Sequence, residues 1–175
     1  HWMGGMGIIV LTVALLPAIG RGAYRLYSAE APGPSAERLR PTVKETAKTL
    51  WSVYFLLSLL ETLLLLLGGM TLFEALCHTF GTMATGGFSV KNGSIGHYQS
   101  VYVETVIIFF MLLAGINFAL HYQALRGNPL RVWRDPELRF FAGVVVVFTA
   151  VSTLSLFRSV YGDLGEALRY SAFQV

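Results

Sequence analysis

Four long apolar runs constrain this chain more than any other feature of its sequence. They extend over residues 2–19, 49–67, 101–125 and 140–160 of the 175-residue chain. An α-helix rises about 1.5 Å per residue, so about 20 apolar residues are enough to cross the hydrocarbon core of a bilayer. Charged residues make up only 13% of the chain, whereas a soluble domain carries about 25%. The sequence therefore predicts an all-α membrane protein.

A short polar segment, GTMATGGFS at Gly81–Ser89, interrupts this pattern between the second and third apolar runs. Non-helical backbone inside a bilayer is tolerated only where protein buries it or where it lines a water-filled cavity. The preceding residues Leu72–Phe80 can form about two to three helical turns, whose C-terminal end would direct partial negative charge at the segment. Gly86 and Gly87 lack a Cβ atom, so they can turn backbone carbonyls towards a common axis. We predict a re-entrant loop that lines a cation pathway.

Two further local patterns predict how helices begin and pack. Thr71 precedes the expected short helix, and Glu74 follows three residues later, which is the spacing of a capping box. Gly4, Gly5 and Gly7 would let the first helix approach a neighbouring element closely, as small residues do in membranes. Both patterns predict local packing and carry no chemistry of their own.

Basic residues indicate the orientation of the chain in the membrane. Ten of the thirteen lysine and arginine residues lie in the loops 21–48 and 126–139, while residues 90–100 contain only Lys91. Such residues are retained on the cytoplasmic side, so we expect both loops there and the Gly81–Ser89 segment entering from outside. The basic residues lack interleaved aromatic side chains suited to bases, so no nucleic-acid partner is expected.

An internal repeat with an offset of 92 residues explains the order of the runs. Leu164–Val175 aligns with Leu72–Met83, and the fourth apolar run aligns with the second. The repeating unit is a helix, a re-entrant half-helix, a filter loop and a second helix, and we expect further units on both sides in the native protein. The expected organisation begins with a closing helix at 1–20 and a cytoplasmic loop at 21–48. One complete unit follows at 49–125, with its half-helix at 71–81 and its filter at 82–89. A second cytoplasmic loop at 126–139 leads to the start of the next unit at 140–175.

The filter segment resembles that of potassium-conducting proteins. Thr85-Gly86-Gly87-Phe88-Ser89 is similar to the threonine-hydrophobic-glycine-tyrosine-glycine filter of potassium channels, although the second, fourth and fifth positions differ. The stretches HWMGGMGIIVL, EAPGPS, ETAKTLW and LAGINFALHY resemble the Trk/Ktr/HKT superfamily of cation transporters. The resemblance is closest to the membrane subunit of bacterial Trk potassium-uptake systems.

This resemblance implies a potassium-uptake pore in the bacterial inner membrane, crossed several times by the chain, and not an enzyme. The family builds one pore from four such units, and the match would place K⁺ at the backbone of Thr85, Gly86 and Gly87. Phe88 would complete the filter, and Gly87 would be the selectivity glycine of this unit. K⁺ would be the transported ion, with no cofactor. The resemblance further implies a homodimer that binds a cytoplasmic nucleotide-binding regulatory subunit.

Other side chains leave alternatives open. Gly115 and Asn117 can mark a bend of the third run that faces the pore, or they can serve helix packing. Glu61 lies inside an apolar run, where a carboxylate is costly and often belongs to an ion or proton path. A proton-coupled secondary transporter built on Glu61, His78 and His121 is the first alternative, and a non-conducting helical scaffold is the second. We expect instead that Glu61 caps or pairs near the outer interface.

Overall fold

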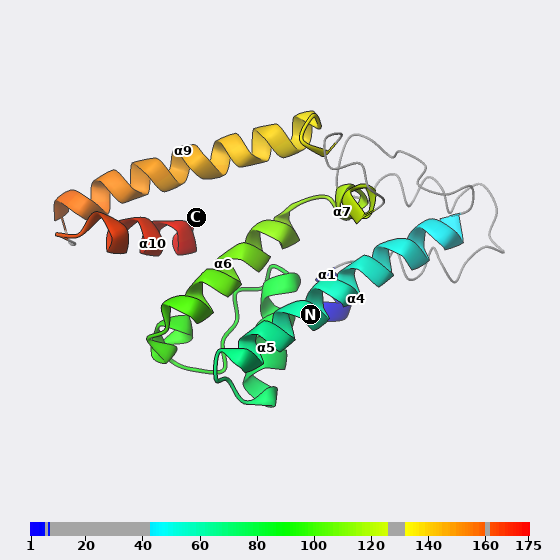
Figure 1. The fold of residues 1–175 in the computed structure, drawn as a ribbon, viewed down its shortest axis with the longest axis horizontal. Coiled ribbons are helices and arrows are strands. Elements are labelled where there is room, and N and C mark those ends of the chain that lie inside the picture. The colour runs from blue at the N-terminus through cyan, green and yellow to red at the C-terminus, as the bar shows by residue number, and fades with distance from the viewer. Residues whose placement is uncertain (6, 8–42, 126–131, 160–161) are drawn as a thin grey trace. The chain divides into compact units, whose positions relative to one another are not determined.

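The computed structural model describes residues 1–5, 7, 43–125, 132–159 and 162–175, and all regular structure in these ranges is helical. The elements are α1 (Trp2–Gly5), α4 (Val43–Leu67), α5 (Leu72–Met83), the 3₁₀ helix η1 (Ser94–Tyr98), α6 (Val101–Gly115), α7 (Phe118–Leu125), α9 (Pro136–Ser159) and α10 (Leu164–Gln174) (Figure 1). The predicted all-α fold is confirmed for the described ranges. Most of the first apolar run and of the first basic loop lies outside the described residues.

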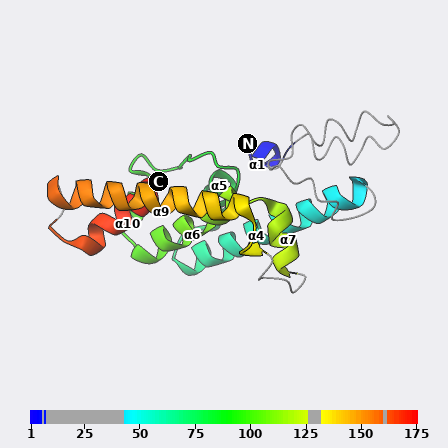
Figure 2. The same cartoon turned by 90° about the horizontal axis from the view of Figure 1, so that it is seen from above.

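The described helices form two compact units, His1–Asn128 and Pro129–Val175. In the first unit α5 packs against both α4 and α6, and Figures 1 and 2 show these three helices side by side. Their fully buried side chains include Tyr54, Met83 and Val103, one from each helix. The short α5 is therefore held between two long apolar helices, as a re-entrant segment must be if its backbone is to be shielded from lipid.

Two described helices, at Ala47–Leu67 and Pro136–Phe157, are long and apolar enough to cross a membrane. A third span results if α6 and α7 are counted as one broken span. The two helices coincide with the second and fourth apolar runs of the sequence. An apolar helix of this length is stable only in lipid or inside protein.

The third apolar run forms two helices, α6 and α7, with a break between them. The axes of α6 and α7 differ by 102° across Ile116 and Asn117. Ile116 is extended, and the Asn117 side-chain oxygen accepts a hydrogen bond from the amide of Ala119 at 3.0 Å, which starts a new helix. A ring nitrogen of His121 lies 2.8 Å from the carbonyl oxygen of Leu113 and bridges the break. A bend here was one of the two alternatives that the sequence left open, and the structure shows it as a break in the run.

The connection between α4 and α5 follows from capping residues. The amide of Gly69 donates to Leu66 at 3.0 Å and that of Met70 donates to Leu65 at 3.3 Å, with Gly69 at φ +88°. This is the Schellman motif, in which a left-handed residue ends a helix. α5 then begins with the predicted capping box of Thr71 and Glu74, which is confirmed. It ends at Met83, two residues later than the predicted half-helix.

The second unit repeats the first hairpin. α10 begins at Leu164, 92 residues after the start of α5, and packs against α9 as α5 packs against α4. Asp163 caps α10 by accepting a hydrogen bond from the amide of Gly165. Ala167 and Ser171 are fully buried, and they correspond at the same offset to Ala75 and Thr79 of α5, which are also fully buried. Small buried residues at equivalent positions let each short helix approach its long partner.

Candidate functional site

The segment after α5 leaves the helix through a second Schellman motif. The amide of Thr85 donates to the carbonyl oxygen of Thr82 at 3.0 Å, and the amide of Gly86 donates to that of Gly81 at 2.7 Å. Thr85 takes the left-handed position that glycine usually occupies, with φ +52°. A β-branched residue in this conformation costs about 1–2 kcal/mol relative to its ordinary backbone geometry. Backbone strain of this kind is found mostly at functional sites.

Backbone handedness alternates along the loop. Thr85 and Gly87 have φ of +52° and +68°, whereas Gly86 between them does not lie in the positive region. We expected both glycines to supply unusual backbone angles, which is correct for Gly87 and wrong for Gly86. Gly86 is required for space, because a Cβ atom there would lie 2.8 Å from the His1 ring and 3.0 Å from the Phe88 ring.

The loop then returns along its own helix. A Cβ atom at Gly81 would lie 3.0 Å from the carbonyl oxygen of Phe88, so the returning backbone passes directly over α5. Gly81 is buried, while Thr85, Gly87 and Phe88 remain exposed. The sequence marked Gly81 only as the start of the polar segment. Its structural role was missed because it depends on a contact with a residue seven positions away.

The N-terminal helix α1 packs against the same region. The ring of Trp2 stacks on Tyr54 and contacts Phe80, with both pairs of ring centroids 5.2 Å apart. Its indole nitrogen donates to the hydroxyl of Ser58 at 3.0 Å, and the Tyr54 hydroxyl donates to the Trp2 carbonyl oxygen at 2.9 Å. A Cβ atom at Gly5 would lie 2.7 Å from Ala84, which confirms close packing for this glycine. Sequence patterns identified Gly5 but not the aromatic contacts.

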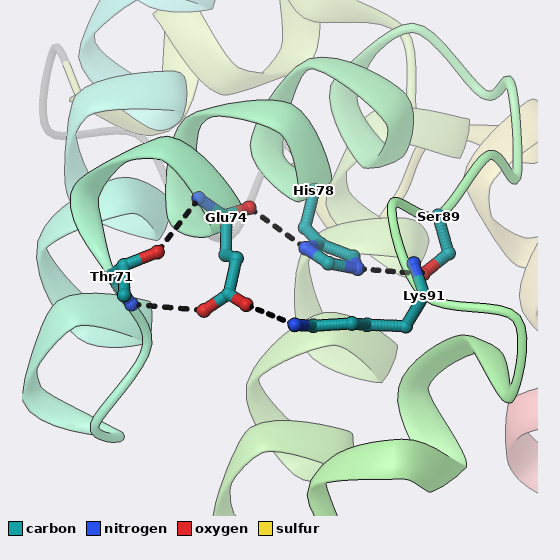
Figure 3. A network of polar contacts seen from close by, with 5 residues as sticks. All are labelled: Thr71, Glu74, His78, Ser89 and Lys91. Carbon is teal, nitrogen blue, oxygen red and sulfur yellow. Dashed lines mark hydrogen bonds and ion pairs between the residues drawn. The ribbon is translucent and has the colours of Figure 1, made fainter.

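A network of polar contacts joins the start of α5 to the segment that follows the loop (Figure 3). The ring nitrogens of His78 lie 2.7 Å from the carbonyl oxygen of Glu74 and 2.9 Å from the hydroxyl of Ser89. The ammonium group of Lys91 lies 2.6 Å from the Glu74 carboxylate, whose other oxygen accepts from the amide of Thr71 at 3.1 Å. These contacts lower the pKa of Glu74 to about 2, chiefly through Lys91, and raise the pKa of Lys91.

Glu61 lies within α4 and is fully buried. Neither oxygen of its carboxylate meets hydrogen-bond geometry with a partner among the described residues, and the nearby Thr82 hydroxyl donates instead to the carbonyl oxygen of His78 at 2.9 Å. The expectation that Glu61 caps or pairs near the outer interface is therefore wrong. The neighbouring Thr62 hydroxyl donates to the carbonyl oxygen of Ser58 at 2.8 Å and lies 3.1 Å from the hydroxyl of Thr79.

The side chains suggested for a proton path do not form one hydrogen-bonded group. His78 bonds to Glu74 and Ser89, and His121 bonds to the carbonyl oxygen of Leu113. Within the described ranges there is also no group of three or more histidine, cysteine, aspartate or glutamate side chains that could hold a metal ion. The two residues proposed for the pore wall, Gly115 and Asn117, lie at the break between α6 and α7, and a pore-lining role for them stays a prediction.

Comparison with known proteins gives the same family for the whole chain. The TrkH family model, described as a cation transport protein, matches residues 1–161. The chain is 46% identical over its full length to the Trk system potassium uptake protein TrkH of Salmonella typhimurium and of Escherichia coli, and covers 37% of each. The crystal structure of the potassium transporter TrkH from Vibrio parahaemolyticus matches with a TM-score of 0.76 at 35% sequence identity, covering 99% of this chain and 35% of that chain.

These matches confirm the resemblance that the sequence motifs suggested. The chain spans little more than a third of the length of the relatives that it matches. The structural match covers almost the whole chain, so it includes α4, α5 and α6. The chain belongs to the TrkH family of cation transport proteins.

Proposed function

We propose that this chain forms part of a potassium-uptake pore in the bacterial inner membrane, with Thr85, Gly86, Gly87 and Phe88 as its contribution to the selectivity filter. The relatives are named for potassium uptake, which supports potassium as the transported ion. The observation that carries the proposal is the loop itself. Its backbone alternates in handedness between Thr85 and Gly87, and it is exposed at these residues while its two ends are bonded to α5.

The proposed chemistry is replacement of water by backbone carbonyl groups. A K⁺ ion that enters the filter loses its hydration shell, and carbonyl oxygens must supply an equivalent set of ligands. The exposure of Thr85, Gly87 and Phe88 supports this chemistry, because a permeating ion must be able to reach the loop. The carbonyl groups at this filter remove no proton and form no covalent bond. The same reading needs neither a cofactor nor enzymatic catalysis.

The α5 dipole supports a cation at this place. The helix has 12 residues, and its C-terminal end leads directly into the loop. Partial negative charge from the last carbonyl groups therefore falls near Thr85. The last turn of α5 carries no basic side chain that would offset this charge. An acidic residue, Glu74, occupies the first turn, where it complements the positive end of the dipole.

The proton-coupled alternative finds less support in the described contacts. It requires Glu61 to exchange protons with neighbouring titratable groups, yet the carboxylate has no hydrogen-bond partner among the described residues. His78 and His121 are bonded to groups other than Glu61. The scaffold alternative accounts for the left-handed position that ends α5, but it gives no reason for threonine there, where glycine would be free of strain.

We further propose that the complete protein forms homodimers and binds a cytoplasmic nucleotide-binding regulatory subunit. Both parts of this proposal rest on the family resemblance. The described helices Ala47–Leu67 and Pro136–Phe157 support insertion in a bilayer. Crosslinking of the complete protein in native membranes, with and without added nucleotide, tests both associations.

The deciding experiment is rubidium and sodium uptake by the complete protein in cells that lack their own potassium-uptake systems. Native protein is compared with Gly87→Ser and with Glu61→Gln. We expect Gly87→Ser to lose rubidium preference or flux, since a side chain at φ +68° strains the filter backbone. Glu61→Gln keeps the shape of the buried acid and should conduct normally. Loss of uptake in Glu61→Gln, with normal uptake in Gly87→Ser, would favour the proton-coupled carrier.

A further inference from the structure

We propose that Glu74, His78, Ser89 and Lys91 form a clamp that holds the outer end of the filter loop to α5 and thereby sets its preference for potassium over sodium. The four are positioning residues, since none of them is among Thr85–Phe88, the residues proposed to bind the ion; Ser89 is the last residue of the predicted filter segment 82–89. The proposal rests on the proposed function of that segment. The sequence patterns gave these residues other roles: Glu74 in helix capping, His78 in the alternative proton path, Ser89 at the end of the filter motif and Lys91 in the orientation of the chain.

The His78–Ser89 contact is the inner half of the clamp. His78 is only 2% exposed, and its ring packs edge-on against Tyr98 of η1, with ring centroids 5.6 Å apart. Its Nδ1 atom faces the carbonyl oxygen of Glu74 at 2.7 Å and must therefore donate. The other nitrogen, Nε2, lies 2.9 Å from the Ser89 hydroxyl. A buried ring with both nitrogens engaged has one orientation.

When the protons are assigned, both ring nitrogens of His78 and the Ser89 hydroxyl have hydrogen-bond partners. With the proton on Nδ1, a neutral His78 accepts at Nε2 and the Ser89 hydroxyl donates to it. The Ser89 oxygen then accepts from the amide of Lys91 at 3.1 Å. One serine therefore links the pore half-helix to the backbone that follows the loop. Removing its hydroxyl leaves a buried ring nitrogen without its partner, which costs more than the bond itself contributes.

The Glu74–Lys91 ion pair is the outer half of the clamp. One oxygen of the Glu74 carboxylate completes the capping box with Thr71, and the other lies 2.6 Å from the Lys91 ammonium group. The side chains of Lys91 and Glu74 retain 33% and 15% of their exposure, so water and salt partly screen the pair. A single carboxylate thus joins the start of α5 to the chain beyond Ser89, as Figure 3 shows.

The consequence concerns the five residues between the end of α5 and Ser89, 84–88. At their first end Thr85 and Gly86 bond to the last turn of α5, and at their second end Ser89 bonds to His78 on the same helix. A filter discriminates between ions of equal charge by the spacing or the rigidity of its carbonyl groups. With both ends held, the loop cannot contract around the smaller sodium ion. Release of the second end should therefore lower selectivity more than it lowers flux.

The test uses the complete protein in cells without other potassium-uptake systems and measures the ratio of rubidium to sodium uptake. The variants are Ser89→Ala and Lys91→Met, which act on the two halves of the clamp. Ser89→Thr keeps a hydroxyl and should restore the native ratio. Ser52→Ala and Lys48→Met serve as matched controls, because the Ser52 hydroxyl donates to the carbonyl oxygen of Lys48 within α4 and both residues are exposed.

We expect Ser89→Ala to lower the ratio of rubidium to sodium uptake by about tenfold, because it leaves one buried polar group without its hydrogen-bond partner. Lys91→Met should lower it by about twofold, because a partly exposed ion pair contributes less. The ratio compares two ions in the same membrane, so it does not depend on how much protein accumulates. A native ratio in both variants, at measurable rubidium uptake, would overturn the clamp.

Gly87→Ser in the same experiment separates the two proposals. If Gly87→Ser changes the ratio while Ser89→Ala and Lys91→Met do not, the filter assignment stands and the clamp is wrong. If none of the three changes the ratio, the filter assignment itself fails, and the clamp fails with it. A change in the control variants equal to that in Ser89→Ala would also reject the clamp, since it would show a general sensitivity to substitution.

Discussion

The hairpin of α4 and α5 and the hairpin of α9 and α10 have the same frame but different chemistry. Both pair a long apolar helix with a short capped helix, at an offset of 92 residues. Ala75 and Thr79 in α5 are fully buried, as are Ala167 and Ser171 in α10. The features that repeat are the small buried residues, which allow the two helices of each hairpin to pack closely.

The differences lie at positions that packing alone does not determine. Glu61 of α4 corresponds to Thr153 of α9, and both are buried. The Thr153 hydroxyl donates to the carbonyl oxygen of Thr149 at 2.7 Å, whereas the Glu61 carboxylate has no partner among the described residues. His78 corresponds to Tyr170 and Gly81 to Phe173. Exchange of residues between the hairpins therefore tests which differences matter for transport.

Gly81→Phe should have the largest effect, because it places the residue of the second hairpin under the returning filter loop. A Cβ atom at this position already lies 3.0 Å from the carbonyl oxygen of Phe88, and a phenyl ring must displace that backbone. We expect rubidium uptake to fall by at least about tenfold. Gly143→Phe on α9, where a Cβ atom would meet nothing within 4 Å, is the control. Normal uptake by Gly81→Phe would show that the return path of the loop is not important.

Trp2→Ala should have the next largest effect, on stability. Trp2 contacts Tyr54 and Phe80 and bonds to Ser58, so its removal opens a cavity beside the first hairpin. Substitution of a buried tryptophan costs about 3–5 kcal/mol, and the partial exposure of Trp2 places the expected loss near the lower limit. Thermal unfolding in detergent measures it. Trp2→Phe keeps most of the ring contacts and should lose about 1 kcal/mol; an equal loss for both variants would contradict the packing argument.

Glu61→Thr should raise the free energy of unfolding, since it places at position 61 the residue type that α9 has at the equivalent position 153. A threonine can donate to the carbonyl oxygen four residues earlier, as Thr153 does, and the unpartnered buried acid is removed. We expect a gain of about 1–3 kcal/mol in the free energy of unfolding, with rubidium uptake maintained. Thr153→Glu is the reciprocal variant and should be destabilised. A stable Glu61→Thr protein without uptake would assign Glu61 a role in conduction.

The smallest expected effect is the loss of the Glu74–Lys91 ion pair, and of the stability it contributes, at acidic pH. The pKa of Glu74 is lowered from 4.5 to about 2, so the folded state gains stability above the ordinary pKa and loses it as the pH falls towards 2. Stability should therefore be insensitive to this group between about pH 8 and pH 5. The unfolding temperatures of native protein and Lys91→Met should converge as the pH is lowered below 4.5. A difference that grows on acidification would show that the ion pair is not its source.

Much of the first hairpin was predictable because it depends on local patterns. Apolar length predicted α4, and the spacing of Thr71 and Glu74 predicted the start of α5. A bend near Gly115 and Asn117 was one of two alternatives that the sequence left open, and its size of 102° was not predicted, because the extended conformation of Ile116 depends on its tertiary environment. Glu61 was placed wrongly, since hydropathy cannot tell which side of an apolar helix faces protein.

The sequence by itself determined the class of the protein, the register of its repeat and the segment proposed as filter. These properties depend on composition, periodicity and a short motif, all of which are local. Only the tertiary structure decided that Thr85, not Gly86, takes left-handed backbone, and that Gly81 supports the returning chain at Phe88. It also brought Ser89 and Lys91 to His78 and Glu74. These contacts join residues from different segments of the chain. Their energies depend on burial and on distances between side chains, which the tertiary structure sets and a single stretch of sequence does not.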